Sequence, residues 1–339
     1  MYRNKMKISN VFTQQFDIQF PVIMAPMFLV SNLEMVKAGM KSGIAATFPS
    51  LNYREDGELE AILNKLNAEQ NNSTGRYGVN LIVQKSNPMY SKHLDVCVEK
   101  KVPFYITSLG SPAEVIKKAH SYGAKVLCDV TNIVHAQKCY DLGCDGFIAV
   151  GQGAGGHAGN NPLMLLVPAL KKAFPDRIVI GAGGVATGDA IASILALGGE
   201  GVSVGTRFIA TPEAGVNDGY KNAIVDSSME DIVMSTKISG TPCTVINTEY
   251  AKKIGHTQNW FERVLSKNKK TKKYFKMLVQ FRGMKKLEES VTRGSYKTLW
   301  VAGKSSEMIN EIVPCVDIIE RLKQETFESL AKLGDLVGD

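Results

Sequence analysis

The stretch of the chain best suited to chemistry is residues 151–159, which read GQGAGGHAG. It follows a short apolar run, and four glycines and an alanine precede a single histidine, His157. Because glycine has no Cβ atom, a backbone of this composition can lie close to a bound ring. The imidazole titrates near neutral pH and can accept or donate a proton. The stretch is therefore either an active-site loop or a flexible turn with an incidental histidine.

Small and polar residues recur at other places where an apolar run ends. Ala25-Pro26-Met27 and Asn80 follow two early runs, and residues 181–184 (GAGG) and Gly205-Thr206 follow two later ones. Loops of small residues bring backbone N–H groups close to an anion and are typical of phosphate sites. The sequence thus indicates a site that combines a ring-binding loop, a histidine and a phosphate cradle.

A regular alternation of apolar runs and helical patterns separates these segments. The runs expected to form strands are residues 21–25, 43–47, 77–81, 103–107, 125–130, 146–150, 177–180 and 201–205. The patterns expected to form helices are residues 32–41, 56–67, 91–100, 112–122, 132–142, 163–174, 188–197 and 213–225. Ser111 is the expected N-cap of the fourth helix, and Gly143 is expected to end the fifth. Apolar strands in such a series predict a parallel sheet that is covered on both faces.

Eight strand–helix units are the number that closes a barrel. We therefore predict the α/β class, with a (β/α)8 barrel over roughly residues 15–225. In that fold the active site is built at the C-terminal ends of the strands, where the segments described above fall.

Two patterns in the chain match the dinucleotide-binding fingerprint. Gly181, Gly183 and Ala186 fit GxGxxA, and residues 151–156 fit GxGxxG. The first match stands seventh in the repeating series, and the second runs into HAGNNP instead of opening a helix. We therefore reject a Rossmann fold.

Composition places the chain among ordinary globular proteins. Its 339 residues contain no apolar run near the roughly 18 needed to span a bilayer, and no apolar signal region follows the N-terminus. We expect a cytoplasmic protein without membrane association. The six cysteines form no CxxC pair, which favours reduced, mostly buried thiols, and Cys128 is expected to pack in the core. The histidines have no metal-binding spacing, and those other than His157 are expected to have no role in the site.

Residues 226–339 differ in charge from the barrel region. Residues 252–304 contain 15 Lys and Arg against 3 Asp and Glu, a net charge of +12, whereas the whole chain carries +7. We expect residues 226–339 to form a smaller, mainly helical unit covering the barrel mouth, with an amphipathic helix from Ser306 onward. The basic part is either a solvated face or a docking surface for a polyanion such as an acidic carrier protein. No aromatic-rich motif supports nucleic-acid binding.

Five motifs occur together in an order that resembles the nitronate monooxygenases, also called 2-nitropropane dioxygenases. They are APM at 25–27, GVNL at 78–81, AGGHAG at 154–159, GAGG at 181–184 and VGTRF at 204–208, and the likeness extends to WVAG at 300–303. That family shares its fold and motifs with FMN-dependent enoyl-acyl-carrier-protein reductases and some NADH:quinone reductases. The resemblance covers the whole barrel region and does not choose among these activities.

The resemblance implies bound FMN. His157 matches the active-site histidine of the family, Asn80 and Gly155 would contact the flavin, and Gly184 with residues 203–206 would hold its phosphate. The full set of implied FMN-binding residues is Ala25, Pro26, Met27, Asn80, Val150, Gly155, Gly156, Gly183, Gly184, Ser203, Val204, Gly205 and Thr206. Three positions depart from the usual pattern, since Val150 and Lys304 stand where Gln is common and Gly153 stands where Glu is common.

These expectations lead to an FMN-dependent oxidoreductase acting on a small-molecule substrate, with oxidation of alkyl nitronates by O2 as the first hypothesis. His157 would serve as the base toward a neutral nitroalkane or would hold the nitronate anion. The alternatives are an enoyl-acyl-carrier-protein reductase or an NAD(P)H:quinone reductase, with NAD(P)H as electron donor, and a flavin-binding module without turnover. The sequence leaves open whether the protein is a homodimer.

Overall fold

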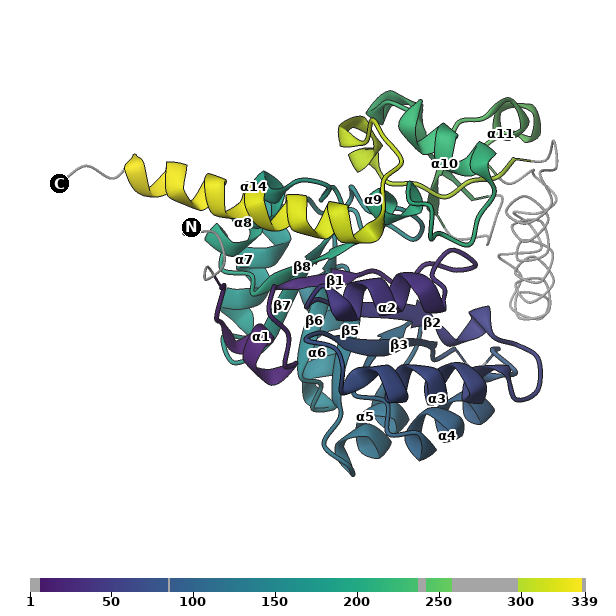
Figure 1. Ribbon diagram of the computed structural model, residues 1–339, viewed down its shortest axis with the longest axis vertical. Coiled ribbons are helices and arrows are strands. Elements are labelled where there is room, and N and C mark those ends of the chain that lie inside the picture. The colour runs from purple at the N-terminus through teal and green to yellow at the C-terminus, as the bar shows by residue number, and fades with distance from the viewer. Residues whose placement is uncertain (1–6, 85, 237–241, 258–297, 337–339) are drawn as a thin grey trace.

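The computed structural model describes residues 7–84, 86–236, 242–257 and 298–336. Within these ranges, parallel strands β1 to β8 close a barrel in chain order (Figure 1). The strands are β1 Val22–Met24, β2 Ala45–Pro49, β3 Arg76–Ile82, β4 Phe104–Ser108, β5 Lys125–Val130, β6 Gly146–Val150, β7 Ile178–Ala182 and β8 Gly201–Val204. The predicted barrel is confirmed.

A helix follows each of the first seven strands and covers the outside of the barrel. These helices are α2 Leu33–Lys41, α3 Glu58–Gln70, α4 Tyr90–Glu99, α5 Ala113–His120, α6 Ile133–Asp141, α7 Leu163–Ala173 and α8 Gly188–Ala196. Side chains fix several starts, since Asn32 and Asn132 accept hydrogen bonds from the backbone N–H groups three residues ahead. Helix α5 differs from the expectation, because its N-cap is Pro112 and not Ser111.

The strands face two separate apolar cores. Side chains that point outward, such as Val79 and Val204, pack with the helices, and side chains that point inward, such as Ile106 and Ile180, fill the barrel. Helix α1 (Val11–Gln15), which the sequence analysis did not predict, adds Phe12 to the inner core. Because α1 packs with the inner core at the N-terminal ends of the strands, the opposite end of the barrel is available for a site.

The chain after β8 begins with two further helices and a small sheet. Helices α9 (Thr206–Ile209) and α10 (Asp218–Val225) lead through the 3-10 turn η2 (Met229–Asp231) to an antiparallel pair, β9 (Ile232–Ser235) and β10 (Cys243–Ile246). Helix α11 (Glu249–Ile254) follows, and a further 3-10 turn, η1 (Ser50–Asn52), lies after β2. Figure 1 shows α10 and α11 beside each other at one end of the barrel. The sequence analysis did not predict the β9–β10 sheet.

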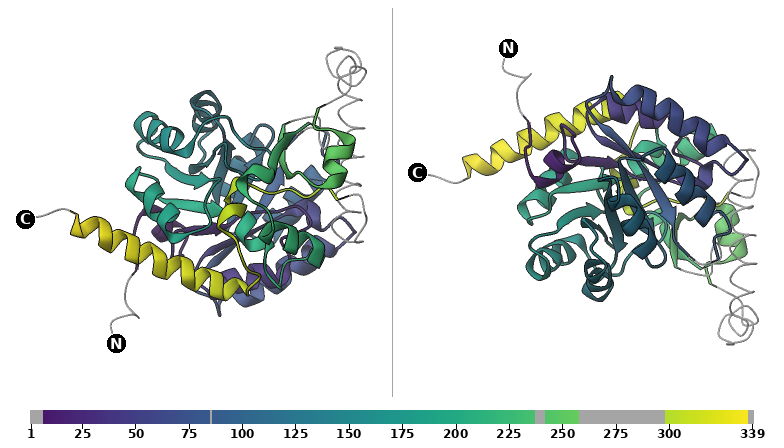
Figure 2. Two further views of the ribbon diagram at one scale, coloured as in Figure 1. Left: turned by 90° about the horizontal axis from the view of Figure 1, so that it is seen from above. Right: turned by 90° about the horizontal axis from the view of Figure 1, so that it is seen from below.

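Helix α14 (Cys315–Asp335) packs on the side of the barrel, not over its mouth. It contacts α8 and α2, and its far end extends past the barrel (Figures 1 and 2). Glu325 on α14 accepts a hydrogen bond of 2.7 Å from the backbone N–H of Gly188. The expected helix from Ser306 onward begins only after Pro314, because residues before a proline are disfavoured in helical conformation and a short 3-10 turn, η3 (Lys304–Met308), comes first.

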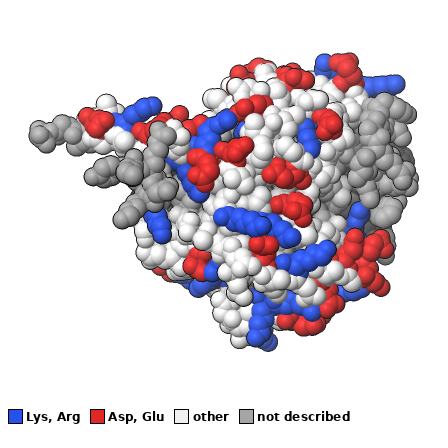
Figure 3. All heavy atoms as spheres, in the orientation of Figure 1, with Lys and Arg blue, Asp and Glu red and all other residues white. Residues whose placement is uncertain are grey.

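Several other expectations concern the surface and the thiols. All six cysteines are free, and only Cys139 is more than slightly exposed. On the face in Figure 3, basic and acidic side chains of the described residues are interspersed. No helix of the described residues is long and apolar enough to cross a membrane. Most of the basic stretch 252–304 lies outside the described residues.

Candidate active site

A cavity of about 1370 Å³ opens at the C-terminal ends of the barrel strands. It collects nearly all of the residues that the resemblance implied. Those lining it are Ala25, Pro26, Met27, Asn80, Val150, Gly155, Gly156, His157, Gly183, Gly184, Ser203, Gly205 and Thr206. Val204 is the exception, because its side chain points outward and is fully buried in the core beneath the helices.

The glycine–histidine loop lies between β6 and α7 and is held from above by β10. Thr244 donates from its backbone N–H to the Gly156 carbonyl and from its hydroxyl to the Ala154 carbonyl, each at 2.8 Å. A Cβ atom on Gly303 would lie 2.6 Å from the Gly153 carbonyl oxygen, so the segment before η3 packs directly on the loop. These contacts fix the backbone that carries His157.

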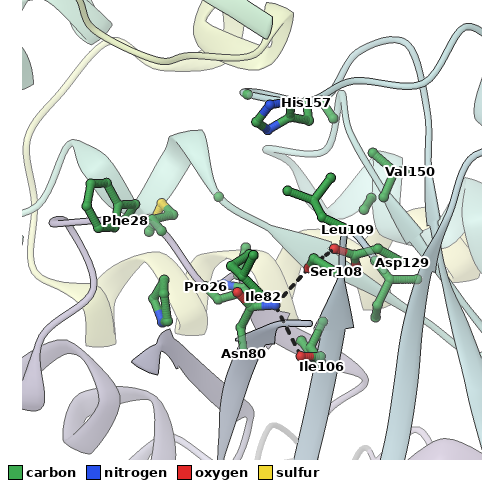
Figure 4. A pocket seen from close by; sticks show the side chains of 18 of the residues that line it. Pro26, Phe28, Asn80, Ile82, Ile106, Ser108, Leu109, Asp129, Val150 and His157 are labelled. Atoms are coloured by element: carbon green, nitrogen blue, oxygen red, sulfur yellow. Dashed lines mark hydrogen bonds between the residues drawn. The ribbon is translucent and has the colours of Figure 1, made fainter. Parts of the chain in front are cut away.

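The His157 imidazole projects into the cavity, where it is accessible (Figure 4). The surrounding protein lowers its pKa below the ordinary value, because the charged form is poorly solvated there. The ring is therefore neutral at neutral pH. A neutral imidazole can accept a proton from a substrate, but it does not supply a permanent positive charge for an anion.

A polar cluster forms the floor of the cavity across three neighbouring strands. The Asn80 amide on β3 donates to the Ser108 hydroxyl on β4 at 2.8 Å and to the Ile106 carbonyl at 3.1 Å, and Ser108 donates to the Asp129 carboxylate on β5 (Figure 4). Burial raises the pKa of Asp129 to about 6, although the hydrogen bond from Ser108 acts in the opposite direction. Sequence reasoning singled out Asn80 but missed Ser108 and Asp129.

The opposite side of the cavity, after β7 and β8, is formed by small residues. Gly183 and Gly184 have φ angles of 115° and 78°, which glycine adopts without strain, and a Cβ atom on Gly184 would meet nothing within 4 Å. The side-chain direction of Gly184 therefore faces open space, whereas its backbone N–H donates to the Gly153 carbonyl at 3.2 Å. The Thr206 hydroxyl accepts a 3.0 Å hydrogen bond from the Gly303 N–H, so it connects this side to the segment above.

The departures from the family pattern have different structural settings. A Cβ atom on Gly153 would lie 3.0 Å from the Gly184 nitrogen, so the backbones of the two loops are in close contact here. Val150 ends β6 and lines the cavity, whereas Lys304 is exposed at the start of η3. The close contact explains why a small residue suits position 153 in this chain.

The remaining wall of the cavity is mainly apolar. Phe28, Leu51, Ile82, Met89 and Leu109 line it, all from the loops and ends of β1 to β4.

Further polar side chains outside the implied set border the cavity, among them one arginine and one histidine. Arg54 lies at this wall, and His135 lies on α6. The expectation that His135 has no role in the site stays a prediction. Cys128 is buried as expected and accepts a hydrogen bond from Thr107 at 3.2 Å.

A model of the nitronate monooxygenase family matches residues 44–325. Among curated proteins, the chain is 28% identical over 252 residues to (3aS,4S,5R,7aS)-5-hydroxy-7a-methyl-1-oxo-octahydro-1H-indene-4-carboxyl-CoA dehydrogenase of Rhodococcus jostii, covering 74% of this chain and 69% of that protein. It is also 28% identical over 297 residues to a probable nitronate monooxygenase of Staphylococcus saprophyticus, covering 74% of this chain and 81% of the other.

Solved structures with the same fold extend the comparison. The structure of FabK from Thermotoga maritima has a TM-score of 0.83 and 27% sequence identity, covering 97% of this chain and all (100%) of that one. Nitroalkane oxidase from Streptomyces ansochromogenes has a TM-score of 0.77 at 21% identity, covering 95% of this chain and 99% of the other. At that identity the second likeness concerns the fold alone.

Proposed function

Because the chain belongs to the nitronate monooxygenase family, and is therefore an oxidoreductase, we propose that it binds FMN and oxidises alkyl nitronates with O2. The observation that carries the proposal is the arrangement of one cavity between a glycine cradle and an accessible imidazole. Gly183 and Gly184 form the cradle after β7, and His157 stands on the neighbouring loop after β6.

The residues present fit FMN. The open space facing Gly184 would take the phosphate, together with Ser203 on β8 and with Gly205 and Thr206 after it. The backbone of Gly155 and the amide of Asn80 would border the ring, and the cavity of about 1370 Å³ exceeds the usual range for one ligand, so a substrate has room beside it. FMN supplies an acceptor for the electrons of the substrate, and the protein supplies position and electrostatics.

His157 would remove the α-proton from a neutral nitroalkane. Its lowered pKa keeps the ring neutral and able to accept that proton. The hydrogen bonds from Thr244 to Ala154 and Gly156 hold the loop in place, so the imidazole keeps its position as the substrate enters.

The test of this function is spectroscopic. Purified protein should show the absorbance of an oxidised flavin, and anaerobic mixing with ethyl nitronate should bleach it. Release of FMN by denaturation, identified against FAD, fixes the cofactor. A protein that takes up no flavin when FMN is supplied in excess would contradict the assignment.

A second candidate is reduction of an acyl thioester with electrons from NAD(P)H. The size of the cavity and the apolar side chains of Phe28, Leu51 and Met89 favour a substrate larger than a nitroalkane. The name of the carboxyl-CoA dehydrogenase relative points the same way. NADH should then bleach the flavin anaerobically, and an enoyl thioester should restore the colour. An acidic carrier protein would be the partner of the basic stretch 252–304, most of which lies outside the described residues.

A further inference from the structure

The Asp129 carboxyl group is an unusual feature of the cavity floor. It lies next to the last residue of β5 and points inward beside Ser108 on β4, and the inward-facing residue before it on β5 is Leu127. Within the described part of the chain its hydrogen-bond partner is Ser108, and no cation forms an ion pair with it. A carboxylate that lies in a largely apolar cavity and pairs with no cation is costly to ionise, so its ionised form does not stabilise the fold.

If FMN binds with its phosphate at the glycine cradle, its ring would lie on the side of the cavity where Asp129 stands. The cradle follows β7 and β8, and Asp129 stands on β5, two strands away around the barrel from β7. A ligand whose phosphate lies at Gly184 extends its other end across the floor, toward Asn80 and Ser108. This step rests on the proposed binding of FMN.

We propose that Asp129 is a further functional residue of the cavity, and that the charge of its carboxyl group controls how readily bound FMN takes up electrons. A negative charge near the ring disfavours additional negative charge on it, whereas the protonated, neutral carboxyl group does not. Ser108 and Asn80 hold the carboxyl group in place, because the serine hydroxyl donates to it while accepting from the asparagine amide.

The groups that face Asp129 from the surrounding elements are few. The Cys139 thiol on α6 interacts with it, and a hydrogen bond with Cys128, together with burial, keeps the pKa of that thiol well above its ordinary value, so it stays neutral. His157 on the β6–α7 loop is neutral at neutral pH, and Lys138 and His135 on α6 border the cavity. Asp129 is a carboxyl group in this part of the cavity whose charge is expected to change near pH 6.

The reduction potential of bound FMN tests the proposal without any turnover. We would measure it by equilibration with redox dyes from pH 5 to pH 8 in the full-length holoprotein and in Asp129→Asn. At pH 5 the two potentials should agree. At pH 8 the potential of the unsubstituted protein should be lower by at least about 30 mV, equivalent to a tenfold change in the relative affinity for reduced and oxidised FMN.

Two further variants test whether the pH dependence of the potential comes from Asp129. Ser108→Ala removes the hydrogen bond that favours the ionised form, so the pH at which its potential separates from that of Asp129→Asn should rise. Asp176→Asn removes an exposed carboxylate paired with Arg177 and should leave the potential unchanged at every pH. A common pH dependence in Asp129→Asn and the unsubstituted protein, both with bound FMN, would overturn this inference alone. Failure of both to bind FMN would overturn it together with the proposed function.

Discussion

Replacing Asp129 with asparagine should stabilise the cofactor-free protein at neutral pH. The two side chains have nearly the same shape, and the amide oxygen of asparagine can accept the hydrogen bond that Ser108 donates to the carboxylate. The substitution therefore removes a buried charge and keeps the hydrogen bond from Ser108. Most substitutions at a partly buried, hydrogen-bonded position would instead destabilise the fold.

The magnitude follows from the raised pKa. The carboxyl group has an ordinary pKa of 3.8 and a pKa of about 6 in the folded protein, a difference of about 2 units. At 1.36 kcal/mol per unit, ionised Asp129 costs roughly 3 kcal/mol of folding free energy at pH 8. The folded chain holds the proton more tightly than the unfolded chain, so this cost is absent below pH 3.8 and develops as the pH rises through 6.

Thermal unfolding at several pH values measures this cost. For a chain of 339 residues the unfolding entropy is roughly 0.7 kcal/mol/K, so Tm of the variant should exceed that of the unsubstituted protein by about 4 °C at pH 8. The two Tm values should converge toward pH 4. A variant that is less stable at pH 8, or a difference that does not depend on pH, would show that the carboxyl group is not poorly solvated.

Four other predictions concern the two sides of the cavity. Gly184→Asp should fold but retain no FMN, whereas Gly57→Asp, at a surface position with a similar positive φ and open space, should keep its FMN. His157→Asn should lose about 10²–10⁴-fold in kcat/KM on neutral nitroethane and much less on its nitronate. Because the pKa of His157 is lowered, the unsubstituted enzyme should keep its activity on nitroethane at pH values below the ordinary pKa of histidine. Gly303→Ala should cost about 1–3 kcal/mol in unfolding experiments, because its Cβ atom would meet the loop backbone. KM for a nitronate should rise above pH 6 in the unsubstituted enzyme and stay flat in Asp129→Asn.

Local pattern was enough to predict the barrel. The bounds expected for β5 and β6 agree with the structure residue for residue, because each is a short apolar run with a clear polar or glycine boundary. Helix α1 was not predicted, because a pattern of five residues is too short to distinguish a helix from a loop. Its inward-facing Phe12 has a role only once the barrel is closed.

The contacts that hold the site could not be predicted in the same way. Thr244 reaches the loop carrying His157 across about 90 residues of sequence, and no local pattern marks that pairing. Asp129 was missed because a single charged residue in an apolar run gives no indication of which face it occupies. The register of β5 against β4 settles this, since it places Asp129 inward beside Ser108. A polar residue at the end of a barrel strand was the available signal.

The charges in the cavity bear on the choice between the two proposed substrate classes. At neutral pH the floor carries the negative charge of Asp129, and the imidazole of His157 is neutral, so neither group attracts an anion. A nitronate would enter against this field unless the carboxyl group is protonated, whereas an enoyl thioester has no charge at its reacting end. The same carboxylate that works against a nitronate has no such effect on a neutral acyl group. The charge of Asp129 therefore favours the thioester above pH 6, whereas Arg54 and Lys138, which also border the cavity, would attract a nitronate.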